Sequence, residues 1–170
     1  MAVLKICHYG DPVLNKVAHE VTEVDDDTRL LLDDMIETMR YAEGIGLAGP
    51  QVGLSRRIVV VELDGQVFKL INPVIVKESG KAKDNEGCLS VPDINGDVER
   101  SVFVTLEYLD ENGEKQVIEA QDLLARCFQH EIDHLNGILF ISKLGRASKF
   151  LLKKKLATLK AQTLSELATA

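Results

Sequence analysis

The chain has 170 residues, of which 45% are hydrophobic, and a formal net charge of −7 at pH 7. This composition is typical of a globular protein and excludes a disordered chain. The acidic net charge argues against general nucleic-acid binding, and we also expect no specific DNA binding. No apolar run approaches membrane-spanning length, and the N-terminus lacks the basic start and cleavage site of a signal peptide. We therefore expect one domain over residues 1–170 in the cytoplasm, without a disulfide framework for its three scattered cysteines.

The first half of the chain predicts short helical segments followed by hairpins. Asp11 before Pro12 is a helix-start signal, and residues 28–41 carry apolar residues at helical spacing. Asp-Gly at 64–65 and Asn-Gly at 112–113 predict tight turns between strands. The expected strands are 57–63, 66–71, 74–78, 102–109 and 115–120.

Two helices are expected in the last third of the chain. Residues 122–136 form the first, with Asp122 as its cap and Gly137 as its stop signal. Residues 147–166 form an amphipathic C-terminal helix whose apolar side packs and whose lysines are solvated. Hairpins together with separate helices predict an α+β fold with largely antiparallel β-sheets packed around a central metal-binding helix.

The motif with the clearest chemistry is His130-Glu131-Ile132-Asp133-His134, inside the helix expected over 122–136. Residues four apart share one helix face, so the two imidazoles can bind one metal ion. Glu131 can then reach a water molecule on that ion. Apolar neighbours show that this helix enters the core, where unpartnered polar groups are costly.

The third protein ligand decides which metal chemistry is available. The match to a metzincin protease extends to Gly137, but Phe140 stands where that signature needs a third histidine. Cys127 lies seven residues before His134, roughly 10 Å along the helix, and is better explained as a packed thiol. Taken alone, Cys88 is better explained as a buried, inert thiol than as a ligand, and Cys7 is interpreted as structural.

Three motifs together resemble the peptide deformylase family. They are Glu86-Gly87-Cys88-Leu89-Ser90, the His130–His134 motif and Gly44-Ile45-Gly46-Leu47-Ala48-Gly49-Pro50-Gln51, and they occur in the family's order. The resemblance runs from about residue 9 to residue 144. At Gly49 the family usually has alanine, so we expect extra local flexibility there.

The glycine segment also fits the dinucleotide-binding fingerprint through Gly44, Gly46 and Gly49. That fingerprint requires a strand before it and a helix after it. Here a helix is expected before it and a strand after it, so we reject nucleotide binding.

The resemblance implies a metal-dependent hydrolase that removes the formyl group from the initiator methionine of new polypeptides and releases formate. Cys88, His130 and His134 would hold one divalent metal ion, with the attacking water in the fourth position. Glu131 would be the general acid and base. The family's oxyanion donors correspond to the Gln51 side chain and the Leu89 N–H.

For the substrate, the resemblance implies main-chain contacts at Ile45 and Gly46, and an apolar pocket that includes Leu123, Cys127 and His130. Arg126 departs from the family pattern because many relatives have an apolar pocket residue there. Residues 93–95, Asp-Ile-Asn, depart because many relatives have a basic residue there. We also expect Asp133 to pair with Arg100.

Iron(II) is the metal that the resemblance favours, and Zn²⁺, Ni²⁺ or Co²⁺ can substitute at a Cys-His-His site. Because deformylases act on nascent chains, the basic C-terminal helix makes the ribosome a candidate partner through RNA phosphates. Two other classes stay open from the residues alone: a zinc metallopeptidase with the same ligands, and a non-catalytic protein stabilised by metal.

Overall fold

The computed structural model describes residues 2–170 and contains two antiparallel sheets. The larger sheet has the strand order β1-β2-β3-β6-β7, and β4 and β5 form a separate two-stranded sheet. The α+β class with antiparallel sheets is therefore confirmed. The strands are β1 Gly46–Ala48, β2 Ile58–Leu63, β3 Gln66–Ser79, β4 Ala82–Cys88, β5 Val91–Arg100, β6 Phe103–Leu109 and β7 Lys115–Gln121.

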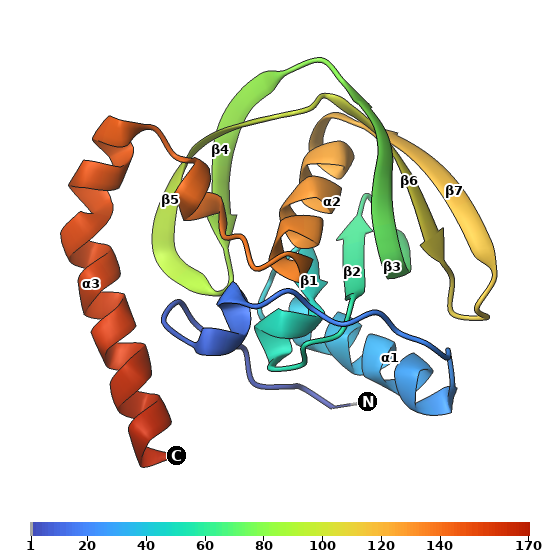
Figure 1. The fold of residues 1–170 in the computed structure, drawn as a ribbon, viewed down its shortest axis with the longest axis horizontal. Coiled ribbons are helices and arrows are strands. Elements are labelled where there is room, and N and C mark those ends of the chain that lie inside the picture. The colour runs from blue at the N-terminus through green and yellow to red at the C-terminus, as the bar shows by residue number, and fades with distance from the viewer. Residues whose placement is uncertain (1) are drawn as a thin grey trace.

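Three α-helices and three short 3₁₀ helices complete the fold. The α-helices are α1 Asp26–Tyr41, α2 Asp122–Leu135 and α3 Arg146–Thr169, and the 3₁₀ helices are η1 Pro12–Asn15, η2 Gly49–Val52 and η3 Phe140–Lys143. In Figure 1, α2 lies at the centre, with β4 and β5 on one side and β2 and β3 on the other. The helix with the two-histidine motif is therefore central, as predicted.

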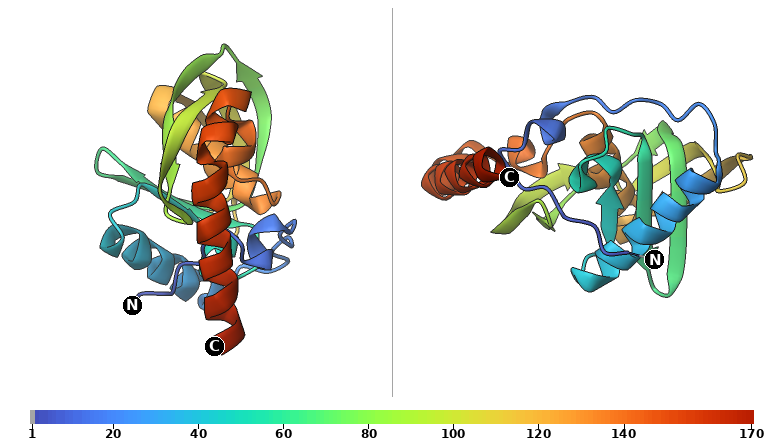
Figure 2. Two further views of the ribbon diagram at one scale, coloured as in Figure 1. Left: turned by 90° about the vertical axis from the view of Figure 1, so that its left-hand side faces the viewer. Right: turned by 90° about the horizontal axis from the view of Figure 1, so that it is seen from below.

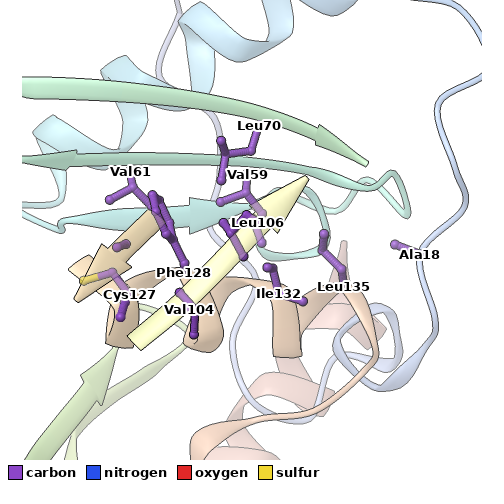
Figure 3. Close-up of a cluster of buried hydrophobic side chains, with 13 residues drawn as sticks. Ala18, Val59, Val61, Leu70, Val104, Leu106, Cys127, Phe128, Ile132 and Leu135 are labelled. Carbon is purple, nitrogen blue, oxygen red and sulfur yellow. The ribbon is translucent and has the colours of Figure 1, made fainter. Parts of the chain in front are cut away.

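The core on one face of the larger sheet is built from α2. Phe128, Ile132 and Leu135 repeat at helical spacing and are buried against the sheet, as Figure 3 shows. Phe128 also meets Phe68 edge to face, with ring centroids 5.4 Å apart. The sheet residues in this cluster include Val59, Val61, Leu70, Val104 and Leu106.

The opposite face of the larger sheet is covered by α1. Ile58 and Val60 of β2 pack in a cluster with Leu32 and Met35 of α1. Because alternate β2 side chains point to opposite faces, its four-residue apolar run is buried on both sides.

The ends of α2 differ in part from expectation. Gln121, not Asp122, is the residue before the helix, and Asp122 has φ 54° and makes no side-chain cap. The predicted Asp122 cap is therefore wrong. The stop at Gly137 is confirmed, since its φ is 73° and a Cβ there would lie 2.8 Å from the Asn15 backbone.

Several strands also differ from expectation. The predicted strands 66–71 and 74–78 are one strand, β3, whose register shifts after Ile71. At the shift Asn72 has φ 51°, and its side chain binds both backbone groups of Val21 at 2.9 Å. The short strand β1 and the hairpin β4–β5 were not predicted.

The C-terminal helix α3 lies along the outside of the molecule (Figure 2). Leu152, Leu156 and Leu159 pack against a small core beside β5, as predicted. Phe150 and Leu151, which also belong to the apolar residues of the helix expected over 147–166, are 78% and 77% exposed, so the expected packing of its apolar residues is wrong at these two positions. Among residues 2–170, no helix is long and apolar enough to cross a membrane.

Candidate metal centre and catalytic pocket

Three candidate metal ligands meet between α2 and the end of β4. His130 and His134 project from one face of α2, and their Nε2 atoms are 3.3 Å apart. Cys88 is the last residue of β4, and its Sγ lies 3.3 Å from His134 Nε2. All three donor atoms lie within 4.8 Å of one another.

These distances fit a tetrahedral metal ion. Two imidazole nitrogens bound at 2.0–2.1 Å to such an ion lie about 3.3 Å apart, and a bound thiolate sulfur lies about 3.6 Å from each. The observed spacings of 3.3 Å agree closely for the nitrogens and within a few tenths of an ångström for the sulfur. The sulfur and nitrogen donors suit zinc and the neighbouring divalent transition metals.

The orientation of His130 is set by Glu86. Its Nδ1 lies 2.8 Å from Glu86 Oε1, so its Nε2 is directed at the other two ligands. Glu86 also accepts hydrogen bonds from Arg100 and Arg126. Burial alone would raise the pKa of Glu86, but the hydrogen bonds from His130 and Arg100 and the charge of Arg100 lower it to about 2.

Arg100 connects this carboxylate to a second one on α2. Its Nη1 donates to Asp133 Oδ2 at 2.8 Å, while Nε and Nη2 donate to Glu86. The predicted pairing of Asp133 with Arg100 is confirmed. Lys143 Nζ lies 3.7 Å from the same Asp133 oxygen.

Glu131 is buried in a confined space beside the candidate ligands. Its Oε2 is buried and has no hydrogen-bond partner among the described residues. Burial raises the pKa of Glu131 to about 7. Gly46 makes room for this side chain, because a Cβ at position 46 would lie 2.7 Å from Glu131 Oε1. A carboxyl group with such a pKa can both accept and release a proton near neutral pH.

The amide of Gln51 has a defined orientation. Its Oε1 accepts the Ala48 N–H at 2.9 Å, and its Nε2 lies 3.2 Å from Ser90 Oγ and 3.5 Å from Cys88 Sγ. The NH₂ group therefore faces the turn that carries Cys88 and Leu89. Sequence reasoning named Ser90 only as part of a motif and missed this contact.

A pocket of about 750 Å³ opens onto these groups. Of the residues proposed from the sequence, all except His134 line it; His134 lies behind the wall and is fully buried. The proposed residues on the wall are Ile45, Gly46, Gln51, Cys88, Leu89, Leu123, Cys127, His130 and Glu131. Burial raises the pKa of the Cys127 thiol to about 12, in agreement with a packed, inert cysteine.

The two departures from the family pattern also lie on the pocket wall. Asp93 and Asn95 are exposed at it. Arg126 is mostly buried, and its guanidinium is bound to Glu86 and to two backbone carbonyls. Sequence reasoning missed these contacts, because the i, i+4 spacing shows only that Arg126 and His130 share one face of α2.

Comparisons with known proteins agree with this geometry. Residues 3–150 match the Polypeptide deformylase family. The chain belongs to the peptide deformylase family. It is 50% identical to peptide deformylase 1 of Clostridium acetobutylicum over 147 residues, which cover 86% of this chain and 98% of the relative. It is 53% identical to the peptide deformylase of Halothermothrix orenii over 148 residues, covering 86% and 96%.

Solved deformylase structures share the fold. The enzyme from Thermus thermophilus is 40% identical and superposes with a TM-score of 0.90 over 95% of this chain and 99% of its own. The enzyme from Synechococcus elongatus, solved in complex with actinonin, is 43% identical with a TM-score of 0.85, covering 89% and 85%. This deformylase is therefore a metal-dependent hydrolase that removes the formyl group from N-formylmethionine on nascent peptides. The metallopeptidase and non-catalytic alternatives are set aside.

Proposed function

We propose that Cys88, His130 and His134 hold the catalytic divalent ion of this deformylase. The observation that carries the proposal is that their three donor atoms lie within 4.8 Å of one another, beside the pocket that Glu131 lines. We propose Fe²⁺ as the ion in the cell and expect Zn²⁺, Ni²⁺ and Co²⁺ to bind as well. When bound, the ion lowers the pKa of a water ligand and polarises the formyl carbonyl.

In this proposal Glu131 moves the proton. Its carboxylate accepts a proton from the water that attacks the formyl carbon and then donates it to the leaving amine of methionine. The pKa of about 7, raised by burial, suits both steps at neutral pH. Formate and a peptide with a free amine are the products.

The oxyanion that forms on the formyl oxygen needs hydrogen-bond donors. We assign these to Gln51 Nε2 and the backbone N–H of Leu89. The Ala48 N–H holds the Gln51 amide with its NH₂ group toward Cys88, which supports this role. Leu89 follows Cys88 directly and lines the same pocket. Donors fixed before the reaction stabilise the developing charge without reorganising.

The substrate peptide is proposed to extend along β1. This strand is at the edge of the larger sheet, so one of its sides is open to pair with another strand. Ile45 and Gly46 would make the main-chain contacts. The methionine side chain would lie against Ile45, Leu123, Cys127 and His130, all of which line the pocket.

We further propose that the enzyme works in the cytoplasm and contacts the ribosome through α3. Its exposed basic residues form no salt bridge within residues 2–170, so their charges are available to RNA phosphates. They are Arg146, Lys149, Lys153, Lys154, Lys155 and Lys160. Three free thiols suit a reducing compartment.

The test is formate release from formyl-Met-Ala-Ser by protein prepared without oxygen and loaded separately with Fe²⁺, Ni²⁺ or Zn²⁺. Glu131→Gln should bind metal as wild type does but release formate at least about 10²-fold more slowly. Unformylated Met-Ala-Ser should stay intact. Wild-type turnover in Glu131→Gln would contradict the assigned role, and faster turnover with Zn²⁺ than with Fe²⁺ would contradict the assigned metal.

A further inference from the structure

The strand that carries Cys88 does not belong to the larger sheet. β4 forms its own two-stranded sheet with β5, whereas both histidines are on α2. Backbone pairing therefore does not set the distance between Cys88 and the histidines. Figure 1 shows α2 beside the β4–β5 hairpin, so side chains that cross from the helix to the hairpin contribute to setting it, together with the apolar core beside β5.

Arg126 makes this crossing with a single guanidinium. From α2, its Nη1 donates to Glu86 Oε2 at 2.7 Å and to the Val98 carbonyl at 2.8 Å, and its Nη2 donates to the Ala82 carbonyl at 2.8 Å. Ala82 and Glu86 are on β4, and Val98 is on β5. One planar group therefore binds both strands of the hairpin, which the compact ammonium of lysine cannot do with the same geometry.

The contacts of Arg126 are made in a buried place. Only 10% of its side chain is exposed, and 6% of the Glu86 side chain. Burying such charges is costly unless they are paired and hydrogen-bonded. Breaking the contacts of Arg126 would leave buried charges uncompensated, so these contacts are expected to persist in the folded protein. Removing Arg126 would leave the Val98 and Ala82 carbonyls without this donor.

Arg126 is also coupled to a candidate metal ligand. It lies one helical turn before His130, on the same face of α2. Glu86 binds Arg126 through Oε2 and His130 through Oε1, so the arginine holds the carboxylate in the orientation that faces the imidazole. Farther along β4, two residues after Glu86, is Cys88.

We propose that Arg126 is a positioning residue that clamps the β4–β5 hairpin onto α2 and thereby sets the spacing of the three metal ligands. This inference rests on the proposed Cys88-His130-His134 site. Arg100 also links Glu86 to α2 through Asp133, so the hairpin remains attached when Arg126 is removed. We therefore expect a folded protein with a looser metal site.

The test measures Co²⁺ binding by metal-free protein in competition with a chromophoric chelator. Arg126→Met should lose roughly 10–100-fold in Co²⁺ affinity, the usual effect of removing a group that supports metal ligands. It should also shift the sulfur-to-cobalt absorption band. Arg126→Lys, which can serve only some of the acceptors, should lose less affinity than Arg126→Met but still bind more weakly than wild type.

The matched control is Arg57→Met. Arg57 also binds a backbone carbonyl of α2, at Leu135, and the side chain of Asn136, but neither contact involves the β4–β5 hairpin. This variant should lose thermal stability and keep the Co²⁺ affinity and spectrum of wild type. A residue that contributes only to stability should therefore change the melting temperature when it is replaced, but not the Co²⁺ affinity or spectrum.

Wild-type Co²⁺ affinity and spectrum in Arg126→Met would overturn the proposal, whatever its melting temperature. If Arg126→Met does not fold, wild-type affinity in Arg126→Lys would overturn it. The Cys88→Ser variant tests the proposed ligand set itself, so it distinguishes failure of the Arg126 inference from failure of the proposed metal site. Wild-type protein without a sulfur-to-cobalt band, or a band that persists in Cys88→Ser, would remove the ligand assignment and the inference with it.

Discussion

Glu86 Oε1 lies 2.8 Å from Nδ1 of His130, and the same carboxylate accepts hydrogen bonds from two arginines. A residue of β4 thus orients a candidate ligand on α2. The three partners of Glu86 lie on two elements, because Arg100 ends β5 whereas Arg126 and His130 belong to α2. This carboxylate is therefore the point where the hairpin and the central helix are joined.

From the low pKa of Glu86 we expect the protein to lose stability in acid. The pKa is about 2 in the folded chain against an ordinary value of 4.5, so the ionised form stabilises the fold above about pH 4.5, and this stabilisation is lost as the pH falls toward 2. Glu86→Gln should lower the free energy of unfolding at pH 7 by roughly 3–5 kcal/mol, because it leaves the buried Arg126 without a carboxylate partner and leaves Arg100 with Asp133 alone. The deficit relative to wild type should shrink between pH 4.5 and pH 2 in urea unfolding.

The matched control for Glu86 is Glu111→Gln, which breaks a partly exposed ion pair with Lys69. Exposed pairs contribute about 0–1 kcal/mol, so this variant should unfold almost as wild type does. A deficit in Glu86→Gln that stays constant down to pH 2 would contradict the assigned ionisation.

Gly46→Ala should impair catalysis while leaving the metal ligands in place. The new Cβ would lie 2.7 Å from Glu131 Oε1 and 3.0 Å from its Cγ, so the carboxylate has to move. If Glu131 is the general base, as proposed, its displacement loses part of the 10²–10⁴-fold that such groups typically contribute, and we expect kcat to fall by about 10²-fold. Formate release and metal content would be measured together.

Gly145→Ala is the control for this substitution, since nothing lies within 4 Å of a Cβ built at position 145. It should keep wild-type kcat. Wild-type kcat in Gly46→Ala as well would show that Glu131 tolerates the contact.

Gly49 is required for close packing, which differs from the extra flexibility expected from its sequence. A Cβ there would lie 2.5 Å from the Arg56 carbonyl oxygen and 2.9 Å from that of Leu54. Gly49→Ala, although it restores the residue common in the family, should destabilise this chain by about 1–3 kcal/mol through overpacking. The effect is measured as the melting temperature of Gly49→Ala compared with that of Gly145→Ala. An unchanged melting temperature would mean that the loop at 54–56 shifts to accommodate the new Cβ.

Gln51→Met tests the proposed oxyanion donor with a side chain of similar length. Loss of one such donor typically lowers kcat by 10²–10³-fold, and we expect that loss here with metal content unchanged. The substitution also removes the hydrogen bond to the Ala48 N–H, so a folded variant has to be verified by circular dichroism. A decrease in kcat of less than about tenfold would assign the oxyanion to other donors.

Local patterns were enough for much of this fold. The i, i+4 pair of His130 and His134 needed only a helix, and apolar spacing predicted α1 and α2. Strands β2, β6 and β7 were visible because their apolar residues and turn signals lie next to one another in the chain. These features depend on neighbours within a few residues.

The β4–β5 hairpin could not be predicted in this way. Its first strand reads Ala-Lys-Asp-Asn-Glu-Gly-Cys, which has low strand propensity, and it is stabilised by pairing with β5 and by buried contacts with α2. Asp122 shows the same limit, because its cap signal is local whereas its φ of 54° is imposed by the junction of β7 with α2.

The candidate metal site likewise combines features that are local in the sequence with features that depend on the tertiary structure. The resemblance to the deformylase family pointed to Cys88, His130 and His134, but Cys88 and His134 are 46 positions apart, and no local pattern brings them to 3.3 Å. That distance depends on two elements from different parts of the chain being held together. The buried charges of Glu86, Arg100 and Arg126 hold them, and whether a charged residue is buried and paired depends on the packing of the whole chain.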